Sequence, residues 1–414
     1  MPNYKRTKLA CYSAYFTMAA IFGLPPVLLV PLHELYGISY TLLGTLVLIN
    51  FCTQMAIDLT FTLFGKRWRV DRIMWLMPLI TTVGLALFAL LPVWFPNQVY
   101  MGLVIGTVIF SVSSGLAEVV LSPTIAAIPS DNPQRDMSTL HSLYAFGVFT
   151  VVVASTLFLK AFGNENWQIL TLILAAWPFV ATLLFLRAPM PDMPVAQTSN
   201  RPNATKHRVV GLALCFGGIF FGSCAESAMT SWVSGFMETA LGLDKALGDV
   251  LGLAMFAILL GLTRIAYAKF GKKILPTLLV GMMGASVCYL VVGLVGNVAV
   301  SFIACILTGV FTSMLWPGML IAMEENIENA GVVAFALMAA GGDLGASVAP
   351  QMMGVVIDTV AASPMTQTLS QTTGMSVDQI GMKAGMLTSA VFPILGVVLL
   401  LILMRYFKKK KEQA

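Results

Sequence analysis

Four carboxylates lie deepest within the long apolar stretches of this sequence, where acidic residues are rare. They are Glu118, Glu226, Asp343 and, nearer the end of its stretch, Asp58. A charge inside a bilayer costs on the order of a few kcal/mol, so an acid retained there is a functional candidate. Because loss of water disfavours the charged form, such a group can bind and release a proton near neutral pH. We predict that Glu118 and Glu226 couple proton movement to another process. The structural alternative for Glu118 is a hydrogen bond to a hydroxyl group or to His141.

Aromatic side chains near these acids are candidates for contact with a small polar solute. Trp232 follows Glu226 by six residues, and together they offer a hydrogen-bond acceptor and the flat apolar surface that suits a sugar or similar polyol. Trp316 precedes a proline and would lie at a bend. His141 and Tyr144 are one helical turn apart and share a face, and histidine can relay protons. We predict that Trp232, Trp316, His141 and Tyr144 bind substrate. Packing is the alternative for each.

A polar stripe precedes the first acid. Asn50, Gln54 and Asp58 follow one another at steps of four, so they share one helix face that must point away from lipid. We predict that Asn50 and Gln54 contact substrate and that Asp58 is a gating residue. Arg264 lies 206 positions after Asp58, a separation that also relates two Gly-Lys-basic triplets, each at the end of an apolar stretch. We predict gating roles for Arg264 and for Asp343, which stands among glycines.

Composition requires a membrane. The chain has 414 residues, of which 58% are hydrophobic and 10% charged, and soluble domains carry about a quarter of charged residues. Each span needs roughly 20 apolar residues. We therefore expect an all-α membrane protein with twelve spans, near residues 9–31, 38–64, 73–95, 98–127, 138–162, 167–187, 209–240, 246–270, 274–296, 298–323, 331–361 and 380–406.

Basic residues are sorted between the loops. With the N-terminus inside, all 24 Lys and Arg residues fall in inside segments except Lys160, Lys245, Lys383 and Arg264. This asymmetry follows the positive-inside rule and predicts that both termini are cytoplasmic, in a bacterial-type inner membrane. The net charge of +5 therefore does not indicate nucleic-acid binding.

The chain looks duplicated. Glycines and prolines coincide 194 positions apart, at 115 and 309, 123 and 317, and 147 and 341. We expect two six-helix halves, residues 1–187 and 209–414, joined by a cytoplasmic linker at 188–208 that is rich in Pro and Asn. The polar segment 362–379 reads as an outside loop. Parallel repeats of this size are typical of transporters whose halves rock about a site at the membrane midplane.

Motifs for other chemistry are missing from the sequence. The six cysteines, all in apolar stretches, show no CxxC spacing, which argues against disulfides and zinc. No GxxxxGK[ST] motif is present, so we expect ion-gradient energy rather than a nucleotide. We predict no cofactor, no metal and no enzymatic activity.

These motifs resemble the fucose permease type of the major facilitator superfamily. The family has a glutamate five residues before a proline, as Glu118 stands before Pro123 here. It also has a serine, two residues, an aromatic and a proline, and a glycine cluster followed by Pro, Gly and Asp. The matching residues are Ser313, Trp316 and Pro317, and Gly341, Gly342, Pro350, Gly354 and Asp358. The glutamate at 226, ahead of an aromatic, is similar to related sugar permeases, and the loop 65–72 partly matches the superfamily's basic signature.

The resemblance has departures as well. The family has amides where His141 and Tyr144 stand and an acid in the first span, where this chain has none. The resemblance implies a monomeric sugar/proton symporter that works by alternating access. A monosaccharide, another polyol or a different organic solute would fit, with sodium as an alternative coupling ion. A proton-driven drug or metabolite exporter stays open, given 25 Met and 25 Phe, as does a non-transporting receptor or scaffold.

Overall fold

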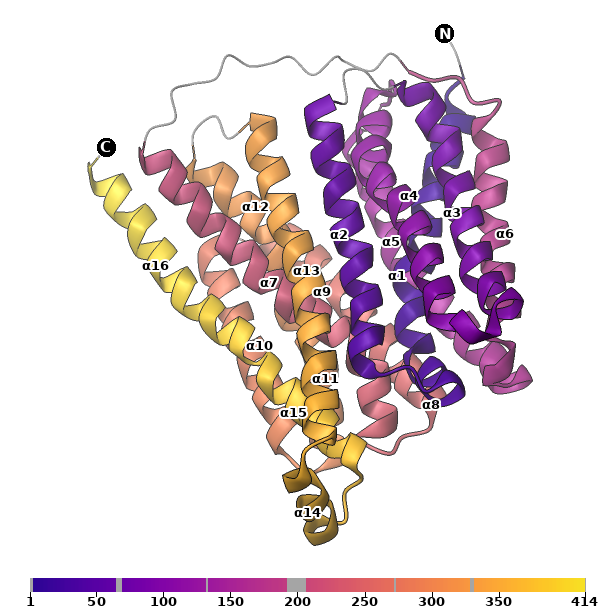
Figure 1. The fold of residues 1–414 in the computed structure, drawn as a ribbon. Helices are drawn as coiled ribbons and strands as arrows, with labels where there is room; N and C mark the ends of the chain where they lie inside the picture. Colours follow the sequence, from indigo (N-terminus) through magenta and orange to yellow (C-terminus); the bar gives the residue numbers. More distant parts are fainter. Residues whose placement is uncertain are drawn as a thin grey trace. The chain divides into compact units, whose positions relative to one another are not determined.

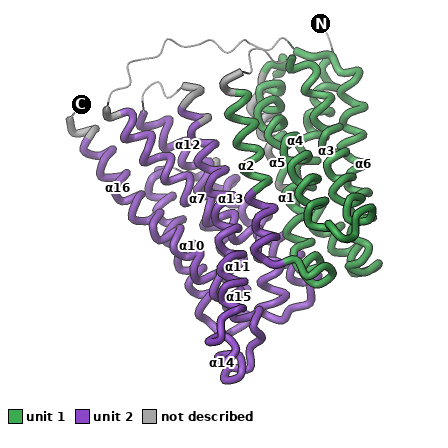
Figure 2. Tube along the Cα trace, viewed as in Figure 1, with its two compact units in different colours: residues 1–38, 49–197 green, residues 39–48, 198–414 purple. Residues whose placement is uncertain are grey.

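The computed structural model describes residues 3–64, 69–131, 133–191, 206–271, 273–327 and 331–413. These residues form helices and turns and no β-strand, so the protein is all-α (Figure 1). Figure 2 shows two compact units: unit 1 holds residues 1–38 and 49–197, and unit 2 holds residues 39–48 and 198–414. Most of the expected linker, residues 192–205, lies outside the described part of the chain. The half boundaries at 187 and 209 stay predictions.

The described part of unit 1 consists mainly of long helices. They are α1 (Lys5–Tyr36), the later part of α2 (Tyr40–Phe64), α3 (Val70–Trp94), α4 (Val99–Ala127), α5 (Pro133–Phe162) and α6 (Trp167–Phe185), with 3-10 turns at Pro96–Gln98 and Asn164–Asn166. Helix α3 packs on α4 and α6, and α1 packs on α5 and α6. A helix satisfies all its backbone hydrogen bonds internally, which lipid requires.

Paired glycine contacts let α3 and α4 approach closely. A Cβ atom at Gly84 would lie 2.5 Å from the backbone nitrogen of Phe110, and one at Gly106 would lie 2.5 Å from the Cα of Phe88. In each helix, the backbone at a phenylalanine therefore packs against a glycine of the other helix. Small residues play this role in membrane helix pairs, where close backbone packing replaces the hydrophobic effect.

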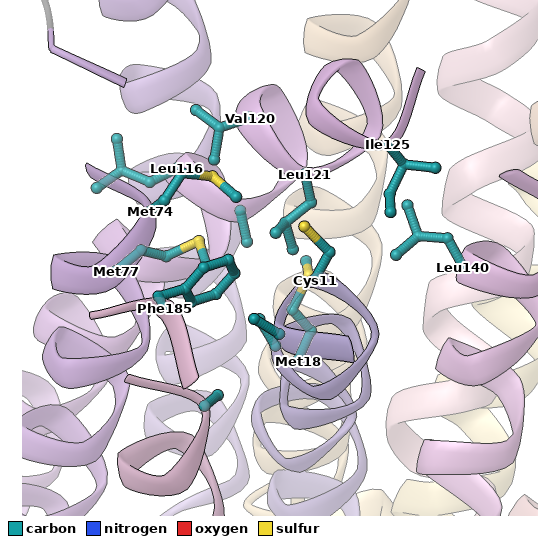
Figure 3. Close-up of a cluster of buried hydrophobic side chains, with 14 of the residues drawn as sticks. Cys11, Met18, Met74, Met77, Leu116, Val120, Leu121, Ile125, Leu140 and Phe185 are labelled. Carbon is teal, nitrogen blue, oxygen red and sulfur yellow. The ribbon is translucent and has the colours of Figure 1, made fainter. Parts of the chain in front are cut away.

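An apolar cluster fills the interior of unit 1 near one end of its helices (Figure 3). Cys11 and Met18 come from α1, Met74 and Met77 from α3, and Phe185 from α6. Helix α4 supplies Leu116, Val120, Leu121 and Ile125. The cluster therefore fixes the rotation of α4 about its own axis, and so decides where its other faces point.

Unit 2 begins with the first turns of α2 and continues after the linker. Its further helices are α7 (Lys206–Thr239), α8 (Lys245–Leu247), α9 (Met255–Phe270), α10 (Ile274–Leu294), α11 (Val298–Thr312), α12 (Leu315–Asn326), α13 (Gly331–Ala361), α14 (Pro364–Thr373), α15 (Val377–Ser389) and α16 (Val391–Gln413). A π-helical segment, η4 (Gly248–Ala254), joins α8 to α9. Helix α13 packs mainly on α7, and Gly345 brings it against the backbone of Phe220.

The expected spans correspond to helices. Over the described residues, 11 helices are long and apolar enough to cross a membrane, and a shorter apolar stretch, Phe146–Phe162, lies within α5. The prediction of an all-α membrane protein is confirmed. The predicted loop at 362–379 is wrong, because Pro364–Thr373 forms α14 and α15 begins at Val377. A proline at the first helical position and a left-handed Gly374 at the end explain why this polar segment is helical.

Prolines act differently in different helices. Pro25 and Pro26 lie inside α1, which runs as one helix from Lys5 to Tyr36. The span that contains Pro317 is divided instead, between Thr312 and Leu315. Helix α4 contains Pro123 without a break in the helix. A proline therefore marks a place where a helix can be divided, and neighbouring helices decide whether it is.

Candidate functional site

Glu118 lies on a polar face of α4. Its neighbours on that face, three or four residues apart and so one above the other, are Thr107, Ser111, Ser114 and Ser122. The Glu118 side chain is exposed, although Leu116 and Ala117 before it and Val120 after it are buried in the unit 1 cluster. The carboxylate therefore points away from the packed interior of the unit.

The exposed apolar face of α4 has a different direction. It carries Met101, Ile105 and Val108, all exposed and spaced to form one stripe. At 100° per residue, Glu118 lies about a quarter turn from the centre of this stripe. The apolar stripe suits lipid. On the face of Glu118, Thr107, Ser111 and Ser114 are buried, so its accessible part is Glu118 and the half-buried Ser122.

Asn50 and Gln54 form a polar seam between α2 and α4. Gln54 Nε2 donates to Asn50 Oδ1 at 3.0 Å, and Ser111 Oγ donates to the same oxygen at 2.6 Å. A Cβ atom at Gly115 would lie 2.9 Å from the Cβ of Ile57, so glycine permits the approach. Asn50 and Gln54 are 7% and 1% exposed, which places them against α4 rather than on an accessible surface. Direct substrate contact by these two residues stays a prediction.

Tyr144 belongs to a group of four rings that we call the aromatic wall: Tyr15 and Phe22 of α1, Phe51 of α2 and Tyr144 of α5. Ring centroids are 6.4 Å apart for Tyr15 and Tyr144, 5.7 Å for Phe22 and Tyr144, and 5.8 Å for Phe22 and Phe51. All four side chains are half-buried. The wall combines apolar faces with two phenol groups.

His141 and Asp58 are the two remaining predicted site residues of unit 1. The side chain of His141, on α5, lies outside the described part of the structure. Asp58 is buried, at 8% exposure, as its place in the inward stripe of α2 predicts. Residues 65–68 of the expected basic signature lie outside the described residues.

Glu226 and Arg264, predicted separately, form a salt bridge in unit 2. Arg264 Nη2 lies 3.6 Å from Glu226 Oε1, between α9 and α7. The second oxygen, Glu226 Oε2, is buried without a hydrogen-bond partner among the described residues. Arg264 Nε also donates to the carbonyl of Ser313 at 2.8 Å. The sequence did not indicate a partner for Arg264, because salt-bridge partners are fixed by helix packing.

Trp316 lies against the glycine that precedes Asp343. The half-buried indole of Trp316 lies against Gly342, where a Cβ atom would overlap the ring. Asp343 follows and is 4% exposed. Gly342 therefore lets α13 accept the tryptophan of α12, whereas Gly341 faces Phe216 and Ile219 of α7.

Trp232 does not share a face with Glu226. Its side chain is fully buried, its Nε1 donates to the carbonyl of Pro350 at 3.1 Å, and its ring meets that of Tyr40 edge-on at 5.8 Å. Six residues turn an α-helix by about 240°, which explains the separation. These contacts are those of a packing residue, and a substrate role for Trp232 stays an untested prediction.

Asp358 has a structural role that we did not predict. Its carboxylate accepts hydrogen bonds from the backbone nitrogens of Tyr40 at 3.1 Å and Thr41 at 2.6 Å. It thereby caps the start of α2, an end that favours negative charge. Gly354, one turn earlier, permits the approach because a Cβ atom there would overlap the Tyr40 carbonyl. The spacing of Gly354 and Asp358 was the available signal, although it named no partner.

Comparisons with known proteins agree with this architecture. The model of a family described as the Major Facilitator Superfamily matches residues 11–350. The chain belongs to the Major Facilitator Superfamily. It is therefore a multi-pass membrane transporter, and the resemblance found in its sequence is confirmed at the level of the superfamily. None of the curated protein sequences matches it.

Solved structures of other superfamily members share the fold. A bacterial homolog of the human lysosomal transporter Spinster has 13% identity, a TM-score of 0.78 and 98% coverage of both chains. A D-xylose–proton symporter has 14% identity and a TM-score of 0.73, over 94% of this chain and 97% of its own. The E. coli fucose:proton symporter has 14% identity and a TM-score of 0.59, over 98% and 99%. At such identities the likeness shows the fold alone.

Among the described residues, no group of three His, Cys, Asp or Glu side chains could hold a metal ion.

Proposed function

We propose that this protein is a secondary active transporter that moves a small polar solute together with protons by alternating access. Glu118 is the proton-binding group. The observation that carries the proposal is the place of its exposed carboxylate, on the hydroxyl-rich face of α4 and about a quarter turn from the apolar stripe. A charge in a membrane helix is tolerated where it meets water or a partner, and such positions commonly bind protons or ions.

The aromatic wall supports a solute with both apolar and hydroxyl-bearing faces. Tyr15 and Tyr144 can donate and accept hydrogen bonds, and their rings, with those of Phe22 and Phe51, offer flat apolar surface. A monosaccharide has this combination, because its C–H groups gather on one side of the ring. We therefore propose a monosaccharide or similar polyol in contact with Tyr144 of unit 1. Trp316 of unit 2 is a separate candidate for solute contact.

Glu226 is the second candidate for coupling. One of its oxygens faces Arg264, and the other is buried without a hydrogen-bond partner among the described residues. A proton or a solute hydroxyl group bound there would satisfy that oxygen. Asp58, Arg264 and Asp343 are proposed gating residues on the strength of their burial or their position within spans.

The sorted basic residues support an orientation of the protein in the membrane. They favour cytoplasmic termini and an inner membrane of bacterial type, and import driven by an inward proton gradient is the proposed mode. Drug export by proton antiport is the second candidate, and the aromatic wall also suits an apolar drug. A thermal-shift panel of monosaccharides, polyols and apolar cations separates the two, since a ligand that binds the folded state raises its Tm.

Reconstituted liposomes test the proposal. With an inward proton gradient, we expect the wild-type protein to accumulate the monosaccharide found by thermal shift. Glu118→Gln removes the titrating group and keeps the shape, so uphill accumulation should be lost while solute exchange without a gradient persists. Glu34→Gln, at an exposed end of α1, is the matched control and should behave as wild type. Undiminished uphill uptake by Glu118→Gln would end the assignment.

A further inference from the structure

Arg264 divides its guanidinium group between two helices of unit 2. Its Nη2 atom faces Glu226 of α7, and its Nε atom donates to the carbonyl of Ser313, in the turn between α11 and α12. The side chain is 38% exposed and that of Glu226 is 23% exposed. One cation therefore contacts both an acid proposed for coupling and the point where a span is divided.

Pro317 explains why the Ser313 carbonyl is available. In an α-helix this carbonyl would accept a hydrogen bond from the backbone nitrogen four residues later, but that residue is Pro317, which has no N–H. The next nitrogen, of Gly318, donates to Met314 at 2.8 Å. Arg264 thus supplies the donor that the proline removes.

We propose that Arg264 is a positioning residue that links the charge of Glu226 to the division between α11 and α12. The role of Arg264 in transport rests on the proposed function. The link itself rests on the contacts of Arg264 with Glu226 and with the carbonyl of Ser313. With Glu226 charged, Arg264 is held between the acid and the carbonyl. When Glu226 is neutral, one of the two attractions disappears, and the guanidinium is held by Ser313 alone.

The consequence reaches Trp316, which follows the division by two residues and lies against Gly342 of α13. A change in the position of Arg264 alters how the carbonyl of Ser313 is held, and thereby the angle at which α12 leaves α11. The link gives the charge state of α7 a path to the α12–α13 contact beside Asp343.

A double-mutant cycle tests the link without any transport assay. Arg264→Gln should lower the Tm of the purified protein by roughly 3–8 °C, because a charge-assisted hydrogen bond and an ion pair are lost. Pro317→Ala restores an N–H four residues after Ser313. In that background Arg264→Gln should cost less than half as much, since the carbonyl no longer needs the arginine. Arg187→Gln, an exposed arginine in unit 1, is the control and should leave Tm unchanged in both backgrounds.

Two further measurements keep the proposal open to refutation. Arg264→Lys keeps the charge, but a single ammonium group cannot reproduce the divided fork of a guanidinium. It should lose at least half of the stabilisation with Pro317 present, and Pro317→Ala should rescue it. In liposomes, Arg264→Gln should lower the maximal exchange rate about tenfold with little change in KM, as expected for a residue that acts on a conformational step.

Equal Tm losses for Arg264→Gln in the two backgrounds would overturn the proposal, as would wild-type Tm and uptake for Arg264→Lys. Because the cycle measures stability, its failure would leave the Glu118 experiment untouched. Loss of coupling in Glu118→Gln would likewise leave the cycle intact.

Discussion

Removal of the Asp358 carboxylate should destabilise unit 2 through the start of α2. The first four backbone N–H groups of a helix have no partner within it. In α2 all four have one: Asp358 takes those of Tyr40 and Thr41, and Ser39 takes those of Leu42 and Leu43 through its hydroxyl and carbonyl oxygens. Asp358→Ala leaves two of the four unpaired.

The expected loss of stability follows from the two hydrogen bonds that Asp358 accepts. Loss of a capping aspartate costs about 0.5–2 kcal/mol, and hydrogen bonds to a charged group are at the upper end of the usual range. For a unit of about 200 residues, 2 kcal/mol corresponds to a fall in Tm of roughly 4–8 °C. Asp358→Asn keeps an acceptor oxygen but loses the charge, so about half of that fall is expected.

Thermal unfolding of the detergent-purified protein, followed by circular dichroism, measures the effect. Asp378→Asn is the matched control, because Asp378 also lies in the first turn of a helix, α15, and among the described residues no hydrogen bond joins it to another helix. The control should change Tm by less than about 2 °C. A Tm for Asp358→Ala within 1 °C of wild type, by the same estimate, would refute the capping argument.

Two further predictions concern unit 1. Lys8 donates a hydrogen bond to Asp136, which lowers the pKa of the Asp136 carboxyl group below its usual value of 3.8. The Lys8–Asp136 pair therefore stabilises the fold fully above pH 3.8, and this stabilisation is lost as pH falls through the lowered pKa. We expect Asp136→Asn to lower Tm at pH 7 and to reduce the fall in Tm on acidification below about pH 4, and an unchanged acid profile would contradict this. Gly84→Ala should lower the free energy of unfolding by about 1–3 kcal/mol in a denaturation series, because the added Cβ would meet the backbone of Phe110. Gly296→Ala is the control, since the space around Gly296 is open. Equal stabilities of the two variants would contradict the close packing of α3 on α4.

The sequence predicted the fold class because lipid imposes a simple rule. Runs of about 20 apolar residues must become helices, and the chain contains such runs throughout. Polar segments outside the membrane are not bound by that rule. Residues 364–373, predicted as loop, form α14, where local capping by a proline and a left-handed glycine decides the structure.

The effect of each proline could not be predicted from its position alone. Pro25 and Pro26 lie within an unbroken α1, while Pro317 divides a span. At Pro317, Arg264 satisfies the freed carbonyl of Ser313. Such compensation comes from a residue 49 positions away and appears only when the helices pack.

The candidate site was predictable in residue type more than in partnership. Periodicity correctly placed Asn50 and Gln54 on one buried face, and their bond to each other follows from their spacing. Their bond to Ser111 depends on how α2 meets α4, which no spacing encodes. Trp232 was grouped with Glu226 by proximity along the chain, although the helical turn sends them in different directions.

Proton movement itself is the most direct test of the central claim, that the carboxylate of Glu118 carries the coupled proton. Liposomes that contain the protein and a pH-sensitive dye are given the monosaccharide found by thermal shift, with no ion gradient imposed. We expect the lumen to acidify as the sugar enters through the wild-type protein. For Glu118→Gln we expect constant pH, while the variant still exchanges labelled for unlabelled sugar. Sugar-dependent acidification by Glu118→Gln at the wild-type rate would contradict the account.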